Sequence, residues 1–154
     1  MFRNKKIFLI DYVFILIAFG IGLITFLLMN HSYLNNSNFV KIAGKTIKVE
    51  LALTPRAQEQ GLSGRKSLKE DEGMLFVFPQ KGRYPFWMKD MNFAIDIIWI
   101  NENNKVIYIQ KDARPDSYPE TFRSNEDAIY VLEVTSSFSD KNNLKVGDIA
   151  EFIH

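Results

Sequence analysis

An uninterrupted apolar run near the N-terminus limits what this chain can fold into. From Tyr12 to Met29, eighteen consecutive residues carry no charge, and Ile7 to Ile10 extend the run beyond Asp11. At about 1.5 Å per helical residue, this length covers about 27 Å, which is close to the hydrocarbon thickness of a bilayer. The run predicts a single transmembrane helix over residues 7–29, which would contact the lipid bilayer.

The charges beside this run predict its orientation. All three basic residues of the N-terminal segment precede it, whereas no Lys or Arg lies between Met29 and Val40. The positive-inside rule therefore places the N-terminus in the cytoplasm. Residues 1–6 are then a cytoplasmic basic start, 30–38 a polar tether rich in Asn and Ser, and 39–154 an extracytoplasmic domain.

A cleaved secretory signal peptide is the alternative to this signal anchor. The apolar core of such a peptide usually runs about 7–15 residues and ends in small residues at a cleavage site. The run here is longer, and the following NHSYLNNSN has no A-x-A-like site. We favour the uncleaved anchor, and cleavage stays open as the alternative.

The residue inventory excludes several kinds of chemistry. The chain has no cysteine, so it has no disulfide, thiolate zinc site or cysteine nucleophile. Its two histidines, His31 and His154, lie just after the apolar run and at the last residue, which disfavours serine triads and histidine metal sites. Residues 38–154 carry 16 basic and 17 acidic residues, a balance that disfavours nucleic acid as a partner. We expect no cofactor and no metal.

The domain after the apolar run shows the pattern of short strands. We predict a mostly antiparallel β domain, barrel-like or a small sandwich, with two short helices. Thr54 as N-cap, Pro55 at the first helical position and Gly61 after the end predict a helix over 55–60. A second helix is expected within 136–142. The expected strands cover 39–42, 46–53, 73–78 (ended by Pro79), 86–89, 95–100, 106–110, 128–135 and 148–153.

Residues 111–127 lack periodicity, and we expect a structureless functional or mobile loop there. Its carboxylates offer the oxygen ligands that Ca²⁺ or Mg²⁺ uses, but their spacing matches no calcium-loop pattern. A solvated acidic loop is therefore the better interpretation. The residues concerned are Asp112, Asp116, Glu120, Glu126 and Asp127.

The segment from Arg83 to Asp96 is the best candidate for a binding site. If Phe86 and Met88 face the core, Trp87 and Lys89 face the other way. An aromatic ring beside a cation, flanked by Tyr84 and Met91, suits a groove that stacks on a sugar or holds an extended peptide. The alternative is that these aromatic residues only pack in the core. The ligand-binding candidates are Tyr84, Trp87, Lys89 and Asp96.

Two carboxylates are expected on apolar faces of central strands. Asp96 shares a face with Ile98 and Ile100, and Glu133 shares one with Val131 and Ile129. A carboxylate in that position needs a cation or several amide donors, and Lys89, Arg83 and Arg65 are candidate partners for Asp96. As weak catalytic candidates, Asp96 and Glu133 would suit a glycosidase-type acid/base pair, if their separation allowed it. Structural roles are the alternative that we favour.

Six segments resemble, in this order, the family known as domain of unknown function 192, a family of uncharacterised conserved membrane proteins. The resemblance spans about residues 47–152, and FWMK at 86–89 is its most specific part. It implies a compact β-rich fold, secreted or carried behind an N-terminal hydrophobic segment, and it implies no activity. The segments are GLSGRKSL, DEGMLFVFP, FWMKDM, IDIIWI, YVLEV and LKVGDI.

The sequence departs from the family pattern at two pairs of residues. Asp90-Met91 stands where family members look more like Asn-Thr, and Phe93-Ala94 where Ile-Pro is more typical. These departures weaken any site that needs a side-chain amide at Asp90 or a rigid turn before Ile95.

Three functions remain open from the sequence. The leading hypothesis is a membrane-anchored extracytoplasmic domain that binds an envelope glycan, peptide or protein through the Trp87/Lys89 region and the 111–127 loop, without catalysis. An envelope hydrolase using Asp96 and Glu133 is the first alternative. A structural subunit of a membrane assembly is the second.

Overall fold

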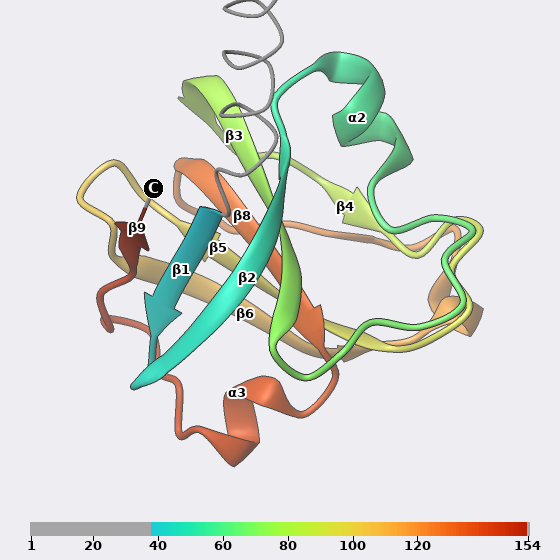
Figure 1. The fold of residues 1–154 in the computed structure, drawn as a ribbon. Coiled ribbons are helices and arrows are strands. Elements are labelled where there is room, and N and C mark those ends of the chain that lie inside the picture. The colour runs from blue at the N-terminus through green and yellow to red at the C-terminus, as the bar shows by residue number, and fades with distance from the viewer. Residues whose placement is uncertain (1–37, 154) are drawn as a thin grey trace, which may run out of the picture. The chain divides into compact units, whose positions relative to one another are not determined.

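A computed structural model describes residues 38–153 of the chain (Figure 1). The predicted transmembrane helix and the tether lie outside these residues, except Asn38, which begins the first strand. None of the helices within residues 38–153 has the length and apolar character that a bilayer crossing requires.

Seven strands form one sheet, in the order β6-β5-β8-β3-β2-β1-β9. All neighbours in it are antiparallel except β2 and β3, which are parallel. The mostly antiparallel β domain predicted from the sequence is therefore confirmed. The strands are β1 (Asn38–Ile42), β2 (Lys45–Ala52), β3 (Glu72–Gly82), β5 (Ile95–Ile100), β6 (Val106–Ala113), β8 (Ala128–Thr135) and β9 (Glu151–Ile153).

The sheet curls until its two ends meet. A bridge pairs Lys105, just before β6, with Ile149, just before β9. Backbone hydrogen bonds of 2.8 Å from Val106 N to Asp148 O and from Ala150 N to Asn104 O flank this bridge. This closure agrees with a barrel-like architecture, which the sequence left open beside a small sandwich.

Both predicted helices are present, and local sequence explains the first. The crossover between β2 and β3 carries α2 (Pro55–Gln60), where the Thr54 side chain accepts from Ala57 N at 3.2 Å and Gly61 ends the helix with φ 50°. The second helix, α3 (Phe138–Lys141), follows β8 and is shorter than the predicted 136–142. Figure 1 shows α2 and α3 near opposite ends of the sheet.

Apolar side chains pack on both faces of the sheet, and β5 is buried along its whole length. Ile98 and Ile100 belong to a cluster on one face with Leu132 and Val134. On the other face Ile97 and Trp99 pack with Val131, Phe76 and Phe86. The second face is the one that carries the candidate site.

The structure corrects three of the predicted boundaries. Strand β3 does not end at Pro79 but runs to Gly82. Its register against β8 shifts after Val77, because proline lacks the N–H that a regular ladder needs. The predicted strand 86–89 is limited to β4 (Phe86–Trp87). The predicted strand 148–153 is paired only over β9.

The segment 111–127 is not a structureless loop. Strand β6 continues to Ala113, a 3-10 turn η1 covers Pro115–Ser117, and β7 (Thr121–Phe122) pairs with β4 as a separate two-stranded sheet. Sequence periodicity missed these elements because each is too short to show a repeat.

Candidate functional site

The residues around β4 alternate between core and solvent. Phe86 and Met88 are buried, whereas Trp87 and Lys89 are exposed, which is the arrangement that the sequence allowed if Phe86 and Met88 face the core. The Trp87 side chain is 43% exposed, which is unusual for the largest apolar side chain. Trp87 is therefore available to a ligand, whereas Phe86 is a core residue.

A pocket of about 250 Å³ opens beside Trp87. One wall is aromatic and comes from the chain around β3 and β4, and the other comes from the end of α2 and the loop after it. Glu133, in the middle of β8, is the acidic group that the pocket reaches in the sheet. The lining residues are Gln58, Glu59, Gln60, Gly61, Leu62, Ser63, Phe76, Phe78, Tyr84, Pro85, Phe86, Trp87, Met91 and Glu133.

Packed rings hold the aromatic wall in place. Tyr84 stacks on Phe78 with ring centroids 3.5 Å apart, and its carbonyl accepts from Trp99 Nε1 at 3.1 Å. The ring of Phe86 packs edge to face against Phe76 and against Trp99, with ring centroids 4.8 Å and 5.6 Å apart. These contacts make a preformed wall rather than a set of mobile side chains.

The opposite wall continues into the loop over residues 61–66, which is tied to residues 89–92. These ties fix the loop over the pocket although its own sequence forms no regular element. Asp90 has a φ of 55°, a conformation that aspartate and asparagine tolerate, so the departure from the family pattern keeps the turn. The three hydrogen bonds, each 2.8 Å, run from Ser63 Oγ to Lys89 O, from Gly64 N to Asp90 O and from Asn92 Nδ2 to Arg65 O.

Glu133 is a buried carboxyl group without a partner. Its side chain is 4% exposed, and Oε2 forms no hydrogen bond. Burial raises the pKa of Glu133 to about 8, and the charge of Arg65 opposes this rise only in part. Glu133 is therefore mainly protonated at neutral pH, with hydrogen-bonding capacity that the protein leaves unused.

Gly61 makes room for this carboxyl group. A Cβ placed on Gly61 would lie 3.9 Å from Glu133 Oε2 and 3.4 Å from Phe76 Cζ, and the residue has a φ of 50°. A side chain here would be strained and would cover the base of the pocket. From the sequence Gly61 is predicted only as the end of a helix, although its place in GLSGRKSL is a signal of a further role.

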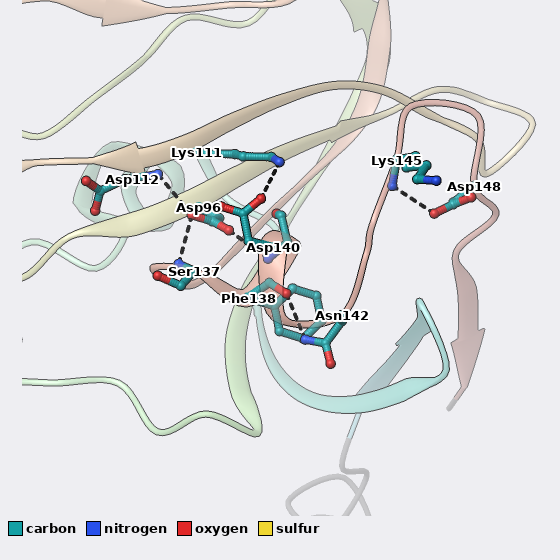
Figure 2. Close-up of polar contacts among 10 residues, drawn as sticks. Asp96, Lys111, Asp112, Ser137, Phe138, Asp140, Asn142, Lys145 and Asp148 are labelled. Carbon is teal, nitrogen blue, oxygen red and sulfur yellow. Dashed lines mark hydrogen bonds and ion pairs between the residues drawn. The ribbon is translucent and has the colours of Figure 1, made fainter.

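Asp96 has a different role from Glu133. It is fully buried, and it accepts hydrogen bonds from the backbone amides of Asp112 (3.0 Å) and Ser137 (3.3 Å), as Figure 2 illustrates, and from the amide of Ser139 (2.8 Å). Of the two kinds of partner that the sequence allowed for Asp96, a cation or several amide donors, the structure has the amide donors. The carboxylate ties β5 to β6 and to the start of α3, which makes it a structural group.

None of the cations considered as partners of Asp96 contacts it. Arg65 pairs with Glu50, and Arg83 lies 3.7 Å from Asp127. Lys89 forms no ion pair with any residue in the described part of the chain, and it does not line the pocket. Asp96 and Lys89 therefore stand apart from the pocket that Tyr84, Trp87 and Glu133 share.

The two carboxyl groups do not form the pair that a glycosidase needs. In the β5–β8 ladder Asp96 lies opposite Val134, and Ile97 lies opposite Glu133. Directly opposed residues point to the same face and successive residues to opposite faces, so Asp96 and Glu133 lie on different faces of the sheet. This arrangement corrects the hypothesis of a shared acid/base site on one bound sugar.

The 111–127 segment does lie beside Trp87. The β4–β7 ladder places Thr121 opposite Trp87 and Phe122 opposite Phe86. Its Asp112 is held by Ser136 Oγ and by Arg114, which together lower the pKa of that carboxyl group. Within residues 38–153, no three acidic or histidine side chains gather as a metal site.

The fold and the site define a class: a mostly antiparallel β domain in which an aromatic pocket reaches one buried, unpartnered carboxyl group. The chain belongs to the family of domain of unknown function 192, described as "Uncharacterized ACR", whose profile matches residues 38–152. That description assigns no activity.

Two solved structures share the fold. A protein from Sinorhizobium meliloti, whose description proposes a role as a transcription regulator, is 30% identical, with a TM-score of 0.71 over 75% of this chain and 93% of its own. A protein of unknown function from Novosphingobium aromaticivorans is 27% identical, with a TM-score of 0.70 over 73% of this chain and 83% of its own. None of the functionally curated proteins compared with this sequence matches it.

Proposed function

We propose that this chain is a membrane-anchored, extracytoplasmic binding module that holds an envelope glycan, peptide or protein in the pocket beside Trp87. The observation that carries the proposal is the pocket itself: a preformed aromatic wall with an exposed tryptophan at its rim and an unused polar group at its base. Ligand sites combine apolar walls with a few polar groups that fix orientation in this way. We assign no catalytic activity to it.

The anchor and the location rest on the sequence. The apolar run over 7–29 has the length of a membrane span, and the basic residues before it favour a cytoplasmic N-terminus. Alkaline phosphatase fused after Ser37 tests this topology, because the enzyme is active only outside the cytoplasm. Activity of the fusion is the expected result, and an inactive, stable fusion would contradict the location.

Binding is tested with the full-length chain in mild detergent. The immobilised chain is incubated with solubilised envelope material, and the free chain is applied to a glycan array. Trp87→Ala should weaken the retained signal about tenfold or more, because Trp87 offers the largest exposed aromatic face at the pocket. Leu53→Ala is the matched control, since Leu53 is an exposed apolar residue that does not line the pocket. An unchanged profile for Trp87→Ala would exclude the site.

Lys89 distinguishes two forms of this proposal. It is exposed and lies two residues after Trp87, but it is not a lining residue. A ligand confined to the pocket should tolerate Lys89→Ala. A ligand that extends along β4 should lose affinity in both variants, and the same assay compares them.

A structural subunit of a membrane assembly is the second candidate function. Three aliphatic side chains near the C-terminal end are exposed: Val146 (60%), Ile149 (56%) and Ile153 (43%). Contiguous exposed apolar side chains are typical of contact surfaces, and this candidate requires these three to form one patch. This candidate predicts co-purifying proteins that are lost in an Ile149→Ser variant, whereas a chain that purifies alone as a monomer argues against it.

A further inference from the structure

We propose that the group bound at the base of the pocket is a cationic amine, an ammonium or guanidinium group on a short apolar stem, held against the carboxyl group of Glu133. This inference rests on the proposed function of the same pocket and names the chemistry of its ligand.

The first observation is the unpartnered carboxyl oxygen. Glu133 lines the pocket, and its Oε2 has no hydrogen-bond partner although the side chain is almost fully buried. A buried polar atom of this kind is costly unless something binds it. A donor from a ligand would supply the missing hydrogen bond, and a charged donor would supply the strongest one.

The second observation is the charge of the lining. The lining contains two acidic side chains, Glu59 and Glu133, and neither lysine nor arginine. An anionic ligand would find no counter-charge there. A cation would find both the carboxyl group at the base and the faces of Tyr84 and Trp87 along the wall, and aromatic faces attract ammonium and guanidinium groups.

The described residues around Glu133 supply no positively charged partner that a ligand cation would have to displace. Its neighbours in the adjacent strands, Met74 on β3 and Ile97 on β5, are uncharged. Arg65, in the loop after α2, is the charged group whose field acts on Glu133, but its guanidinium is bonded to Glu50 and does not line the pocket. The protein therefore has no cation of its own at this position in the described residues.

The dimensions limit the ligand to one small group. A pocket of about 250 Å³ is below the usual range for drug-sized ligands, about 300–1,000 Å³. It suits a single basic side chain of a peptide or the amino group of an amino sugar. These two sources share the amine and differ in its stem, so the experiment compares them directly.

Binding of a cation should displace the proton of Glu133. Burial keeps this carboxyl group protonated up to a pKa of about 8, and an adjacent positive charge favours the ionised form. The apparent affinity for a permanent cation should then rise about tenfold between pH 6 and pH 7, and about one proton should be released for each ligand bound.

The test is isothermal titration calorimetry on the full-length chain in mild detergent, with n-butylammonium as the probe. Two buffers of different ionisation enthalpy report proton release. We expect n-butylammonium to bind, with 1-butanol and butyrate at least about tenfold weaker. Nα-acetyl-lysine amide and glucosamine then distinguish a peptide source from a glycan source. Equal binding of 1-butanol, or affinity without pH dependence, would overturn the inference.

Glu133→Gln keeps the shape of the side chain and removes its charge. We expect it to lose both the proton release and about tenfold or more of the affinity for n-butylammonium. Glu120→Gln, an exposed residue outside the pocket, is the matched control and should retain both. If amines fail to bind while Trp87→Ala still abolishes envelope binding, this inference fails and the proposed function stands. If Trp87→Ala also changes nothing, both fail.

Discussion

Replacing Glu133 by glutamine should make the domain more stable at neutral and alkaline pH. Burial raises the pKa of Glu133 from its ordinary 4.5 to about 8. The native state therefore holds a proton that the unfolded chain releases between these two pH values. Its contribution to stability is fully present below about pH 4.5 and is lost as the pH rises to about 8.

The magnitude follows from the difference between the two pKa values. One pKa unit corresponds to about 1.4 kcal/mol, so a difference of about 3.5 costs the native state about 5 kcal/mol once the pH exceeds 8. The loss accumulates at about 1.4 kcal/mol per pH unit across the window. Because glutamine does not titrate, the free energy of unfolding of Glu133→Gln should exceed that of the native chain by a growing amount over this range.

Urea unfolding at several pH values measures this difference. Both tryptophans, Trp87 and Trp99, lie in the described domain, and the fully buried Trp99 makes fluorescence a sensitive probe of its unfolding. Glu120→Gln, at an exposed site, should show no such gain and serves as the control. If the curves of Glu133→Gln and the native chain stay parallel from pH 5 to pH 8, the reasoning about a buried neutral carboxyl group is refuted.

Three further substitutions and one matched control test the architecture by urea unfolding. Asp96→Asn should cost about 2–4 kcal/mol, because an amide has one acceptor oxygen for the three backbone N–H groups that Asp96 binds; a loss below about 1 kcal/mol would contradict this. Gly73→Ala should cost about 1–3 kcal/mol, since its Cβ would lie 2.7 Å from Glu133 O. The matched Gly44→Ala meets no atom within 4 Å, and its cost should come only from its positive φ. Trp87→Ala should change stability by less than about 1 kcal/mol, because the ring is half exposed; a larger loss would make Trp87 a core residue.

The direction of side chains along a strand depends on local sequence, whereas their partners depend on long-range contacts. Alternation along the chain predicted that Trp87 and Lys89 would face away from the core if Phe86 and Met88 face it, and the structure has this arrangement. The burial of Asp96 and Glu133 followed from the same pattern and is also confirmed. Short-range patterns suffice for these statements because strand geometry fixes the face of each residue.

The partners of these residues did not follow from local pattern. Asp96 is satisfied by amides 16, 41 and 43 residues away in the chain, and no sequence spacing indicates that convergence. For the same reason, the sequence left open whether Asp96 and Glu133 lie close together. Both lie on central strands, but the register of β5 against β8 decides that they face opposite sides.

The sequence by itself determined the strand faces and the first short helix, and it excluded thiol chemistry. It also predicts a membrane anchor. Only the tertiary structure decided that the loop after α2 closes over Glu133, that β7 lies beside Trp87 and that Asp96 is structural. The physical reason is that the direction of a side chain on a strand follows from alternation between adjacent residues. A pocket, by contrast, depends on the register and curvature of strands that are far apart in the chain.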